Sequence, residues 1–415
     1  MPISSRWITL CVVVPRPVRR PDFRSKGLRM EDDAEAATGN WLTGWLPAWC
    51  PTSMARLREA EARILQGLKS PPVCRNVQLP SSHQIWTLSL DRVAGSAGEQ
   101  APLVLVHGFG GGLGLWIQNL ERLSCRRRLF AFDLLGFGRS SRPSFPAEPE
   151  AVEAEFVRSI EEWREQLGLP AMILLGHSLG GYLAASYCIQ HPNRVKHLIL
   201  VDPWGFPERP TDQSEVWKPP VWVKVLAAVL GRFNFLAILR AAGPWGPSLV
   251  QRFRPDLKRK YADMFQDDSI LEYVYHCNAQ TPSLPSLLPQ RGETAFKVLS
   301  EAFGWAKRPM IGRIHLIPKD IPITMIYGSK SWIDSSTGEQ VKALRPDSYV
   351  RTMSIEGASH HVYSDQPQEF NAVVAEICDS VSETPSTSSQ ASPSPTSSPS
   401  SPPTHPSVTV ELVTN

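Results

Sequence analysis

The chain contains 415 residues, of which 42% are hydrophobic, and its 43 basic against 40 acidic side chains leave a formal net charge of only +3. Because this charge is nearly balanced and no RNA- or DNA-binding motif is present, we expect no nucleic-acid partner. The seven scattered cysteines lack C-x-x-C spacing, so neither a disulfide framework nor a metal or cofactor site is expected, and the thiols suit a cytoplasmic setting.

Composition separates a folded centre from two unusual ends. The tail is dominated by serine, threonine and proline and cannot bury a core. The centre is long enough for one domain with an insertion. We therefore expect a disordered extension at 1–40, a tryptophan- and leucine-rich segment at 41–60, a domain at 75–381 that includes a cap at about 205–310, and a disordered tail at 382–415.

Three tryptophans gather in the segment that precedes the domain: Trp41, Trp45 and Trp49. Aromatic rings of this kind suit the interface of a bilayer, and packing on the domain's own surface explains them equally well. The chain has no run of about 18 apolar residues that would span a bilayer. Any membrane contact is therefore expected to be peripheral.

A glycine-rich turn, His107 to Gly112, follows the apolar run 103–106, which predicts a buried strand. Such a turn offers backbone N–H groups to a developing oxyanion, and the N–H of Phe109 is the expected donor. A phosphate-binding loop is disfavoured because the turn lacks the G-x-G-x-x-G spacing and the Gly-Lys-Ser/Thr ending. The next strand, 130–132, ends at Asp133, which is expected to accept hydrogen bonds from local backbone N–H groups.

Ser178 lies in the pattern Gly176-His-Ser-Leu-Gly180, between an apolar strand at 172–175 and a segment with helical spacing. This is the G-x-S-x-G pattern in a strand–turn–helix setting, where the flanking glycines let the backbone pass and leave the hydroxyl exposed. The N–H of Leu179 is the second expected oxyanion donor. Ser178 is therefore the predicted nucleophile of a hydrolase or acyl-transfer reaction.

The acid and the base of such a site are expected to follow the serine in that order along the chain. Asp334 follows a buried strand at 321–328, and His360 follows a final strand at 349–355. We predict that His360 takes the proton of Ser178 and that Asp334 orients the imidazole.

Two alternatives stay open in this assignment. Asp202 ends the strand 198–201, and a carboxylate at the tip of a neighbouring strand can reach the same imidazole. His361 could replace His360 as the base, but neighbouring residues in an extended segment face opposite sides, so only one of them can face the serine.

The segment at about 205–310 is expected to form a helical cap between the sixth and seventh strands. Its helices have few polar positions, so they need cover from the domain, from one another or from an acyl chain. The cap also carries a basic cluster, which is either a solvated helix face or a contact with phospholipid phosphate or an anionic membrane. The cluster comprises Arg252, Arg254, Lys258, Arg259 and Lys260.

From about Trp41 to Val381 the chain resembles the alpha/beta-hydrolase domain-containing subfamily of lysophospholipases and N-acyl-phosphatidylethanolamine lipases. The resemblance implies an α/β-hydrolase fold, a mostly parallel doubly wound sheet with a helical cap, and release of fatty acid from these phospholipids through an acyl-serine, without a cofactor. A lipid-droplet lipase co-activator of the same subfamily has asparagine in place of Ser178, so the serine indicates the hydrolase branch. The resemblance rests on the motifs 41–47, 107–112, 133–141, 202–207 and 273–278.

The same resemblance leaves two other functions open. The subfamily carries an H-x-x-x-x-D motif linked to lysophospholipid (lysophosphatidic acid) acyltransferase activity, matched here by His360 and Asp365. Asp365 also stands just before a helical pattern with a proline, where we expect it to act as an N-cap. The third possibility is a non-catalytic co-activator of another lipase. The expected location is cytoplasmic, with peripheral contact to the endoplasmic reticulum membrane or a lipid droplet.

Overall fold

The computed structural model describes the domain that the sequence predicts, with gaps. The predicted extension, the three tryptophans and the tail lie outside the described residues. Of the apolar cap segment before Gly243, the structure describes only Leu236 and Leu239, and both are buried. The described residues are 52–91, 100–125, 127–210, 236, 239, 243–280, 291–301 and 304–381.

An eight-stranded sheet forms the centre of the described domain, in the spatial order β1-β2-β4-β3-β5-β6-β9-β10. The first two strands pair antiparallel with their neighbours, and all the others pair parallel. The mostly parallel doubly wound sheet is therefore confirmed. The strands are β1 (Val73–Gln78), β2 (Gln84–Leu90), β3 (Leu103–Val106), β4 (Leu129–Phe132), β5 (Met172–His177), β6 (Val195–Val201), β9 (Ile323–Gly328) and β10 (Val350–Ile355).

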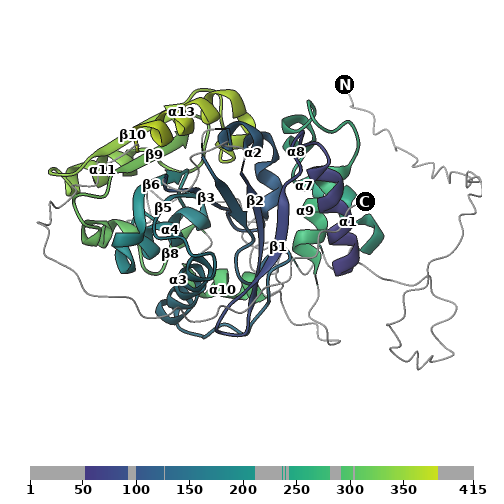
Figure 1. The fold of residues 1–415 in the computed structure, drawn as a ribbon, viewed down its shortest axis with the longest axis horizontal. Coiled ribbons are helices and arrows are strands. Elements are labelled where there is room, and N and C mark those ends of the chain that lie inside the picture. The colour runs from purple at the N-terminus through teal and green to yellow at the C-terminus, as the bar shows by residue number, and fades with distance from the viewer. Residues whose placement is uncertain are drawn as a thin grey trace, which may run out of the picture. The chain divides into compact units, whose positions relative to one another are not determined.

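Helices cover both faces of this sheet (Figure 1). On strand β3, Val104 and Val106 join the apolar core under α3 and α4, whereas Leu103 and Leu105 join the core under α2 and α13. Side chains alternate across a strand, so a strand buried on both faces must be apolar throughout. The helices are α1 (Met54–Leu65), α2 (Ile117–Leu123), α3 (Pro149–Gln166), α4 (Leu179–Gln190), α11 (Ser336–Leu344), α12 (Val362–Asp365) and α13 (Pro367–Ser380).

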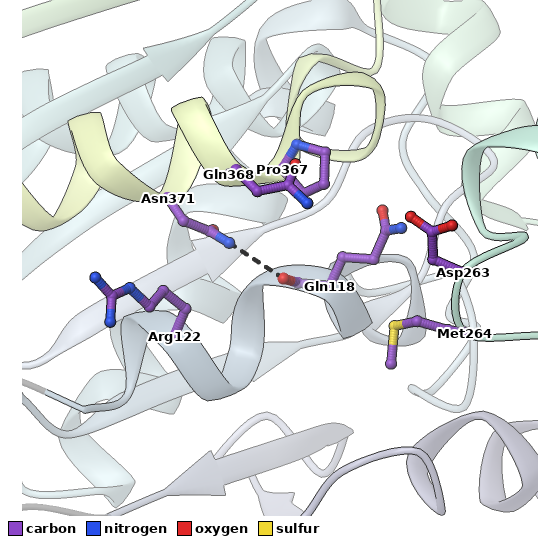
Figure 2. Close-up of a pocket in the computed structure, with 7 residues that line it drawn as sticks. All are labelled: Gln118, Arg122, Asp263, Met264, Pro367, Gln368 and Asn371. Atoms are coloured by element: carbon purple, nitrogen blue, oxygen red, sulfur yellow. Dashed lines mark hydrogen bonds between the residues drawn. The ribbon is translucent and has the colours of Figure 1, made fainter.

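Helices α2 and α13 are joined by a polar contact as well as by apolar packing. The side-chain Nδ2 of Asn371 donates to the backbone carbonyl of Gln118 at 3.1 Å (Figure 2). These two residues belong to the lining of a surface groove that also includes Asp263 and Met264 of the cap. The groove therefore marks a junction between the cap and the domain, and none of the predicted catalytic residues lines it.

The segment between β6 and β9 carries the helical insertion, where the sequence places the cap. Helix α9 packs against α1, and its Tyr273 hydroxyl accepts a hydrogen bond from the N–H of Gly114 at 2.9 Å. Within the described parts of the chain, no helix is long and apolar enough to cross a membrane. The elements of the insertion are α7 (Gly246–Phe253), α8 (Asp256–Lys260), α9 (Ser269–Ala279), α10 (Arg291–Leu299) and a small hairpin of β7 (Ser300–Glu301) and β8 (Trp305–Ala306).

Candidate active site

Ser178 occupies a sharp turn between strand β5 and helix α4. Its φ of 53° lies in the left-handed region, which non-glycine residues adopt only under constraint. The constraint comes from close backbone packing, because a Cβ on Gly180 would lie 2.5 Å from the carbonyl oxygens of Val106 and His107. A Cβ on Gly176 would lie 2.2 Å from the Gly180 oxygen. The two glycines therefore let β5, α4 and the end of β3 approach closely enough to form the turn.

His360 contacts the serine directly. Its Nε2 lies 3.0 Å from Ser178 Oγ, and its Nδ1 lies 2.5 Å from an oxygen of Asp202. Asp202 is fully buried at the tip of β6, and its other oxygen accepts a hydrogen bond from the Gly328 N–H at 3.3 Å. The serine, imidazole and carboxylate therefore form one continuous chain, in which Nδ1–H donates to Asp202 and Nε2 accepts the serine proton.

Asp334 does not take part in this chain, so its predicted contact with His360 is corrected. It is exposed, and its carboxylate accepts hydrogen bonds from the N–H and hydroxyl of Ser336 at 2.9 and 2.6 Å, in the first turn of α11. The alternative acid, Asp202, makes the contact with the imidazole from the tip of β6, which lies next to β5 and its Ser178 turn in the sheet. Ser331, on the turn where Asp334 was expected to act, donates instead to the Asp202 carboxylate.

His177, the residue before the nucleophile, holds the base in place. Its Nε2 lies 2.8 Å from the backbone oxygen of His360, to which it donates as the Nε2–H tautomer. His361, the alternative base, instead places its ring 5.1 Å from that of His177 and 5.8 Å from that of Tyr363. No role was predicted for His177 from the sequence, although its place inside the G-x-S-x-G motif was a usable signal.

Burial sets the protonation state of the candidate base. Burial, followed by the charges of Arg254 and Lys260, lowers the pKa of the His360 imidazole to about 3. Burial likewise raises the pKa of the Asp202 carboxyl, and the hydrogen bond from Ser331 opposes that shift. The resting imidazole is therefore neutral and able to accept the serine proton.

These shifts predict that Asp202, and not His360, titrates near neutrality. The imidazole stays neutral down to about pH 3, whereas the Asp202 carboxyl, with its pKa raised to about 7, loses its charge below neutrality. Because the carboxylate stabilises the imidazolium, we expect kcat/KM to fall about tenfold from pH 8 to pH 6. Initial rates across the range, with circular dichroism at each pH, test this expectation. A flat profile in folded protein would contradict it.

The predicted oxyanion donors lie beside the nucleophile. A Cβ on Gly108 would lie 2.9 Å from the Cβ of Ser178, so the turn that carries Phe109 runs against the serine. Leu179 is the first residue of α4, and the N–H groups of a first helical turn have no partner within the helix. Asn278 of α9 steadies the turn by donating to the Gly110 carbonyl at 2.7 Å. This placement supports the two donor assignments.

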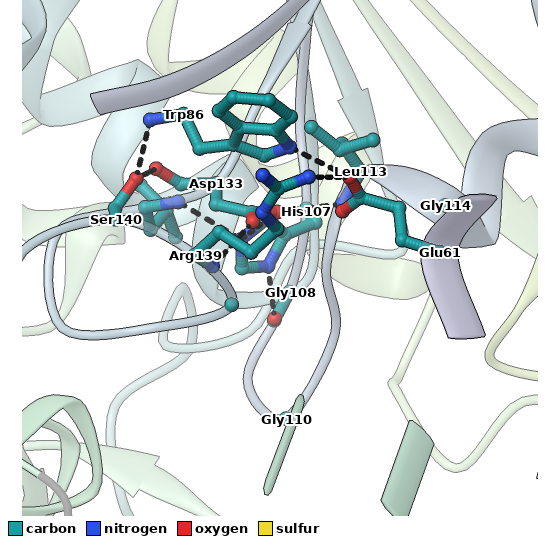
Figure 3. Close-up of polar contacts among 12 residues, drawn as sticks. Glu61, Trp86, His107, Gly108, Gly110, Leu113, Gly114, Asp133, Arg139 and Ser140 are labelled. Carbon is teal, nitrogen blue, oxygen red and sulfur yellow. Dashed lines mark hydrogen bonds and ion pairs between the residues drawn. The ribbon is translucent and has the colours of Figure 1, made fainter. Parts of the chain in front are cut away.

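A buried polar network stands behind this turn (Figure 3). Asp133 accepts hydrogen bonds from the N–H groups of Leu113 and Arg139, both at 2.8 Å, which confirms its predicted structural role. Arg139 also pairs with Glu61 at 2.6 Å and lies over the ring of Trp86 at 3.4 Å. The network was not predicted from the sequence, because α1, β2 and the Asp133 loop bring its members together from distant parts of the chain.

Two carboxyl groups share this buried network. Burial and then the charge of Asp133 raise the pKa of Glu61 to about 7, and the opposite charge of Arg139 lowers it. Burial also raises the pKa of Asp133. Because Glu61 belongs to α1, this helix contributes to the support of the predicted oxyanion turn.

Comparison with known proteins identifies the family. The model of the alpha/beta hydrolase fold family matches residues 101–367. The chain belongs to this family. A (lyso)-N-acylphosphatidylethanolamine lipase from Homo sapiens is 65% identical over 352 residues, which cover 85% of this chain and 100% of that protein. A 1-acylglycerol-3-phosphate O-acyltransferase from Homo sapiens is 54% identical over 356 residues, which cover 85% of this chain and 99% of that protein.

Solved structures agree with this α/β-hydrolase fold. A bacterial membrane phospholipase A matches with a TM-score of 0.54 and 21% identity, covering 79% of this chain and 91% of that chain. Naproxen esterase from Bacillus subtilis matches with a TM-score of 0.54 and 17% identity, covering 78% of this chain and 97% of that chain. At these identities the likeness concerns the fold alone.

In this α/β-hydrolase, Asp365 is not the predicted N-cap. Helix α13 begins at Pro367 with Gln366 at the N-cap position and no side-chain capping bond. The Asp365 carboxylate turns back instead and accepts hydrogen bonds from the N–H and hydroxyl of Ser359, at 2.9 and 2.5 Å. Asp365 is drawn away from the helix end because three donors face it here: the N–H and hydroxyl of Ser359 and the ammonium of Lys260, which lies 3.1 Å away in the cap.

The predicted basic cluster divides into paired and exposed members. Lys258 pairs with Asp268 at 3.0 Å, and Arg254 makes two contacts of 2.9 Å with Asp256. Arg252 and Arg259 are exposed. Among the described residues, no group of three or more His, Cys, Asp or Glu side chains could hold a metal ion.

Proposed function

We propose that this chain is a serine hydrolase that releases fatty acid from lysophospholipids and N-acyl-phosphatidylethanolamine. The observation that carries the proposal is the continuous hydrogen-bonded chain from Ser178 through His360 to Asp202. The substrate class is supported by the relatives that are 65% identical and named (lyso)-N-acylphosphatidylethanolamine lipases. Products of the glycerophospho-N-acylethanolamine type follow if the ester chains of the N-acylated lipid are removed.

Each residue of the hydrogen-bonded Ser178–His360–Asp202 chain then has a defined role in the reaction. Ser178 Oγ attacks the ester carbonyl while His360 Nε2 takes its proton, and Asp202 stabilises the imidazolium that forms. The N–H groups of Phe109 and Leu179 bind the oxyanion. The imidazolium returns its proton to the departing glycerol oxygen, which leaves an acyl-serine. His360 Nε2 next deprotonates a water molecule, whose oxygen attacks the carbonyl of the acyl-serine. The imidazolium then returns its proton to Ser178 Oγ as the bond to the acyl group breaks and the fatty acid leaves.

Aromatic side chains near this site suit an acyl chain. The rings of Phe109 and Phe296 stack at a centroid distance of 4.3 Å, and Trp204 lies 4.8 Å from Phe296. Trp332 is 57% exposed and lies 5.2 Å from the His360 ring. Trp204 and Phe296 are themselves buried, so the exposed ring of Trp332 beside His360 is the aromatic surface that favours a lipid ester over a small polar ester.

Acyl transfer is the second candidate, because relatives that are 54% identical are named 1-acylglycerol-3-phosphate O-acyltransferases. The same acyl-serine would then be resolved by a lysophospholipid hydroxyl instead of water. Hydrolysis is favoured because Asp365 is engaged by Ser359 and Lys260 and makes no described contact with Ser178. A non-catalytic co-activator role is disfavoured by the intact Ser178–His360 contact.

The test measures free fatty acid by mass spectrometry from lysophosphatidylethanolamine and N-acyl-phosphatidylethanolamine, with and without lysophosphatidic acid as an acyl acceptor. We expect fatty acid from both lipids with the wild-type protein, and none above background with a folded Ser178→Ala variant. Phosphatidic acid formed at the expense of free fatty acid would favour acyl transfer. No turnover by folded wild-type protein would favour the co-activator role.

We also propose that this enzyme is cytoplasmic and that its cap binds peripherally to the endoplasmic reticulum membrane or to the surface of a lipid droplet. Trp245 precedes α7 and Phe253 ends it, with 66% and 54% of their surface exposed, and Arg252 and Arg259 are exposed nearby in the sequence. Aromatic and basic side chains together suit an anionic lipid interface.

We expect Trp245→Ala to weaken sedimentation with phosphatidylserine-containing vesicles about fivefold, because a large apolar side chain leaves the interface. Leu316→Ala is the matched control, since Leu316 is 55% exposed outside the cap helices. Equal binding by wild type and both variants would exclude this surface. Phosphatidylcholine vesicles show how much of the binding depends on the basic side chains.

A further inference from the structure

The loop that carries His360 is fixed from several sides. The N–H of Lys330 donates to the Ala358 carbonyl at 2.8 Å, and His177 holds the His360 carbonyl at 2.8 Å. Both of these contacts come from the catalytic domain. A further contact is made by Asp365, which accepts from the N–H and hydroxyl of Ser359, the residue that precedes the base.

Asp365 also joins this loop to the cap. Its second oxygen lies 3.1 Å from the ammonium of Lys260, the last residue of α8, and the two side chains are only 12% and 4% exposed. The Lys260 ammonium has two further acceptors, an oxygen of Asp256 at 3.0 Å and the hydroxyl of Ser359 at 3.2 Å. An ammonium has three N–H donors, so this buried charge is fully hydrogen-bonded. The ion pair between Asp365 and Lys260 is therefore buried and fully hydrogen-bonded, unlike a solvated pair on the surface.

The end of α8 is itself held against the domain. The side chain of Gln118 on α2 donates to the Lys260 carbonyl at 2.8 Å, and the Tyr261 hydroxyl donates to the Leu115 carbonyl at 2.8 Å. Figure 2 shows Gln118 between the cap residues Asp263 and Met264 and the α13 residue Asn371. The position of Lys260 is therefore set by the packing of the cap on α2 and transmitted to the loop of the base through Asp365.

We propose that Asp365 is a positioning residue, which uses its ion pair with Lys260 to hold the Ser359–His360 segment in register with the cap. This inference rests on the proposed function. It gives the H-x-x-x-x-D motif a role in every reaction that uses Ser178, because one end of the motif is the base and the other fixes the loop that carries it. Asp365 does not contact the acyl acceptor in this account.

The role predicts a specific kinetic pattern. Without the carboxylate, the imidazole samples more orientations, and small misplacements of a catalytic group cost large factors in rate. We expect Asp365→Asn to lower kcat for fatty acid release and the rate of fluorophosphonate labelling of Ser178 by about tenfold each, with KM changed less than about twofold. We expect Lys260→Met to have a similar effect. The double variant is expected to be no slower than the slower single variant, because both changes break the same contact.

Lys319 and Asp347 form the matched control pair. They lie 2.6 Å apart as an ion pair that is 70% and 68% exposed, so Lys319→Met and Asp347→Asn should leave both rates unchanged. Thermal unfolding of every variant identifies any that fails to fold, and Ser359→Ala then tests the same contact by removing only one hydroxyl.

The outcomes separate this role from the alternatives. Equal losses of hydrolysis, labelling and any acyl transfer in Asp365→Asn support positioning. Wild-type hydrolysis and labelling in folded Asp365→Asn overturn it, and a selective loss of transfer to lysophosphatidic acid would assign Asp365 to the acceptor instead. Independent losses that multiply in the double variant would also overturn it. Failure of the proposed function would be seen separately, as an absence of Ser178-dependent activity in the wild-type protein.

Discussion

Replacing Asp202 by asparagine is expected to lower kcat by about 10⁴-fold, the loss seen when the carboxylate of a serine triad becomes an amide. The amide N–H can donate to Nδ1 of His360, which places the ring proton on Nε2. Nε2 then cannot accept the proton of Ser178. Asparagine tolerates the left-handed φ of 45° at this position, so the backbone should be little disturbed. Single-turnover release of fatty acid measures the loss.

Asp334→Asn is the matched control for this prediction. The side chain is exposed and contacts Ser336, and an amide oxygen can still accept from the Ser336 N–H. We expect activity within about twofold of wild type, as for most surface substitutions. The reverse pattern, in which Asp334→Asn is inactive and Asp202→Asn is active, would show that Asp334 orients the imidazole, as the order of residues along the chain predicted.

Gly180→Ala is expected to have the second large effect. The added Cβ would lie 2.5 Å from two backbone oxygens, those of Val106 and His107, and backbone cannot move aside as a flexible side chain can. We expect a loss of about 1–3 kcal/mol in the free energy of unfolding, as for other overpacked cores. A displacement of Ser178 from the oxyanion turn should also slow fatty acid release more than about 100-fold.

Gly312→Ala separates this clash from the general effect of a methyl group. No atom lies within 4 Å of a Cβ added at Gly312, so the free energy of unfolding should change by less than about 0.5 kcal/mol. Urea unfolding of the two variants and the wild type measures the difference. If Gly180→Ala were as stable and as active as Gly312→Ala, the close packing of β3, β5 and α4 would not be what shapes the turn.

Local patterns predicted the parts of the site that depend on neighbours in the sequence. The glycines around Ser178 and the strand before it are contiguous, so their spacing alone indicated the sharp turn that the structure shows. His360 was predicted because it follows the last strand of the sheet. The mostly parallel doubly wound sheet with a helical cap was implied by the resemblance to a family, and the spatial order of its strands was not predicted.

The choice between Asp202 and Asp334 required information that the sequence does not contain. It depends on how the turns after β6 and β9 place their side chains: Asp202 is buried against His360 and the Gly328 N–H, whereas Asp334 is exposed and bonded to Ser336. The contact of Lys260 with Asp365 was likewise hidden, because a basic residue in a cluster and an acid before a helix each have an ordinary local explanation. Burial in the packed domain decides between those explanations and a long-range ion pair.

The most direct test of the central claim is to label the purified protein with a fluorophosphonate and map the adduct by mass spectrometry of its peptides. The Ser178–His360–Asp202 chain predicts one adduct, on Ser178, which forms at the wild-type rate in Asp334→Asn and far more slowly in Asp202→Asn. An adduct on another serine, or no adduct on folded protein that still releases fatty acid, would contradict Ser178 as the nucleophile.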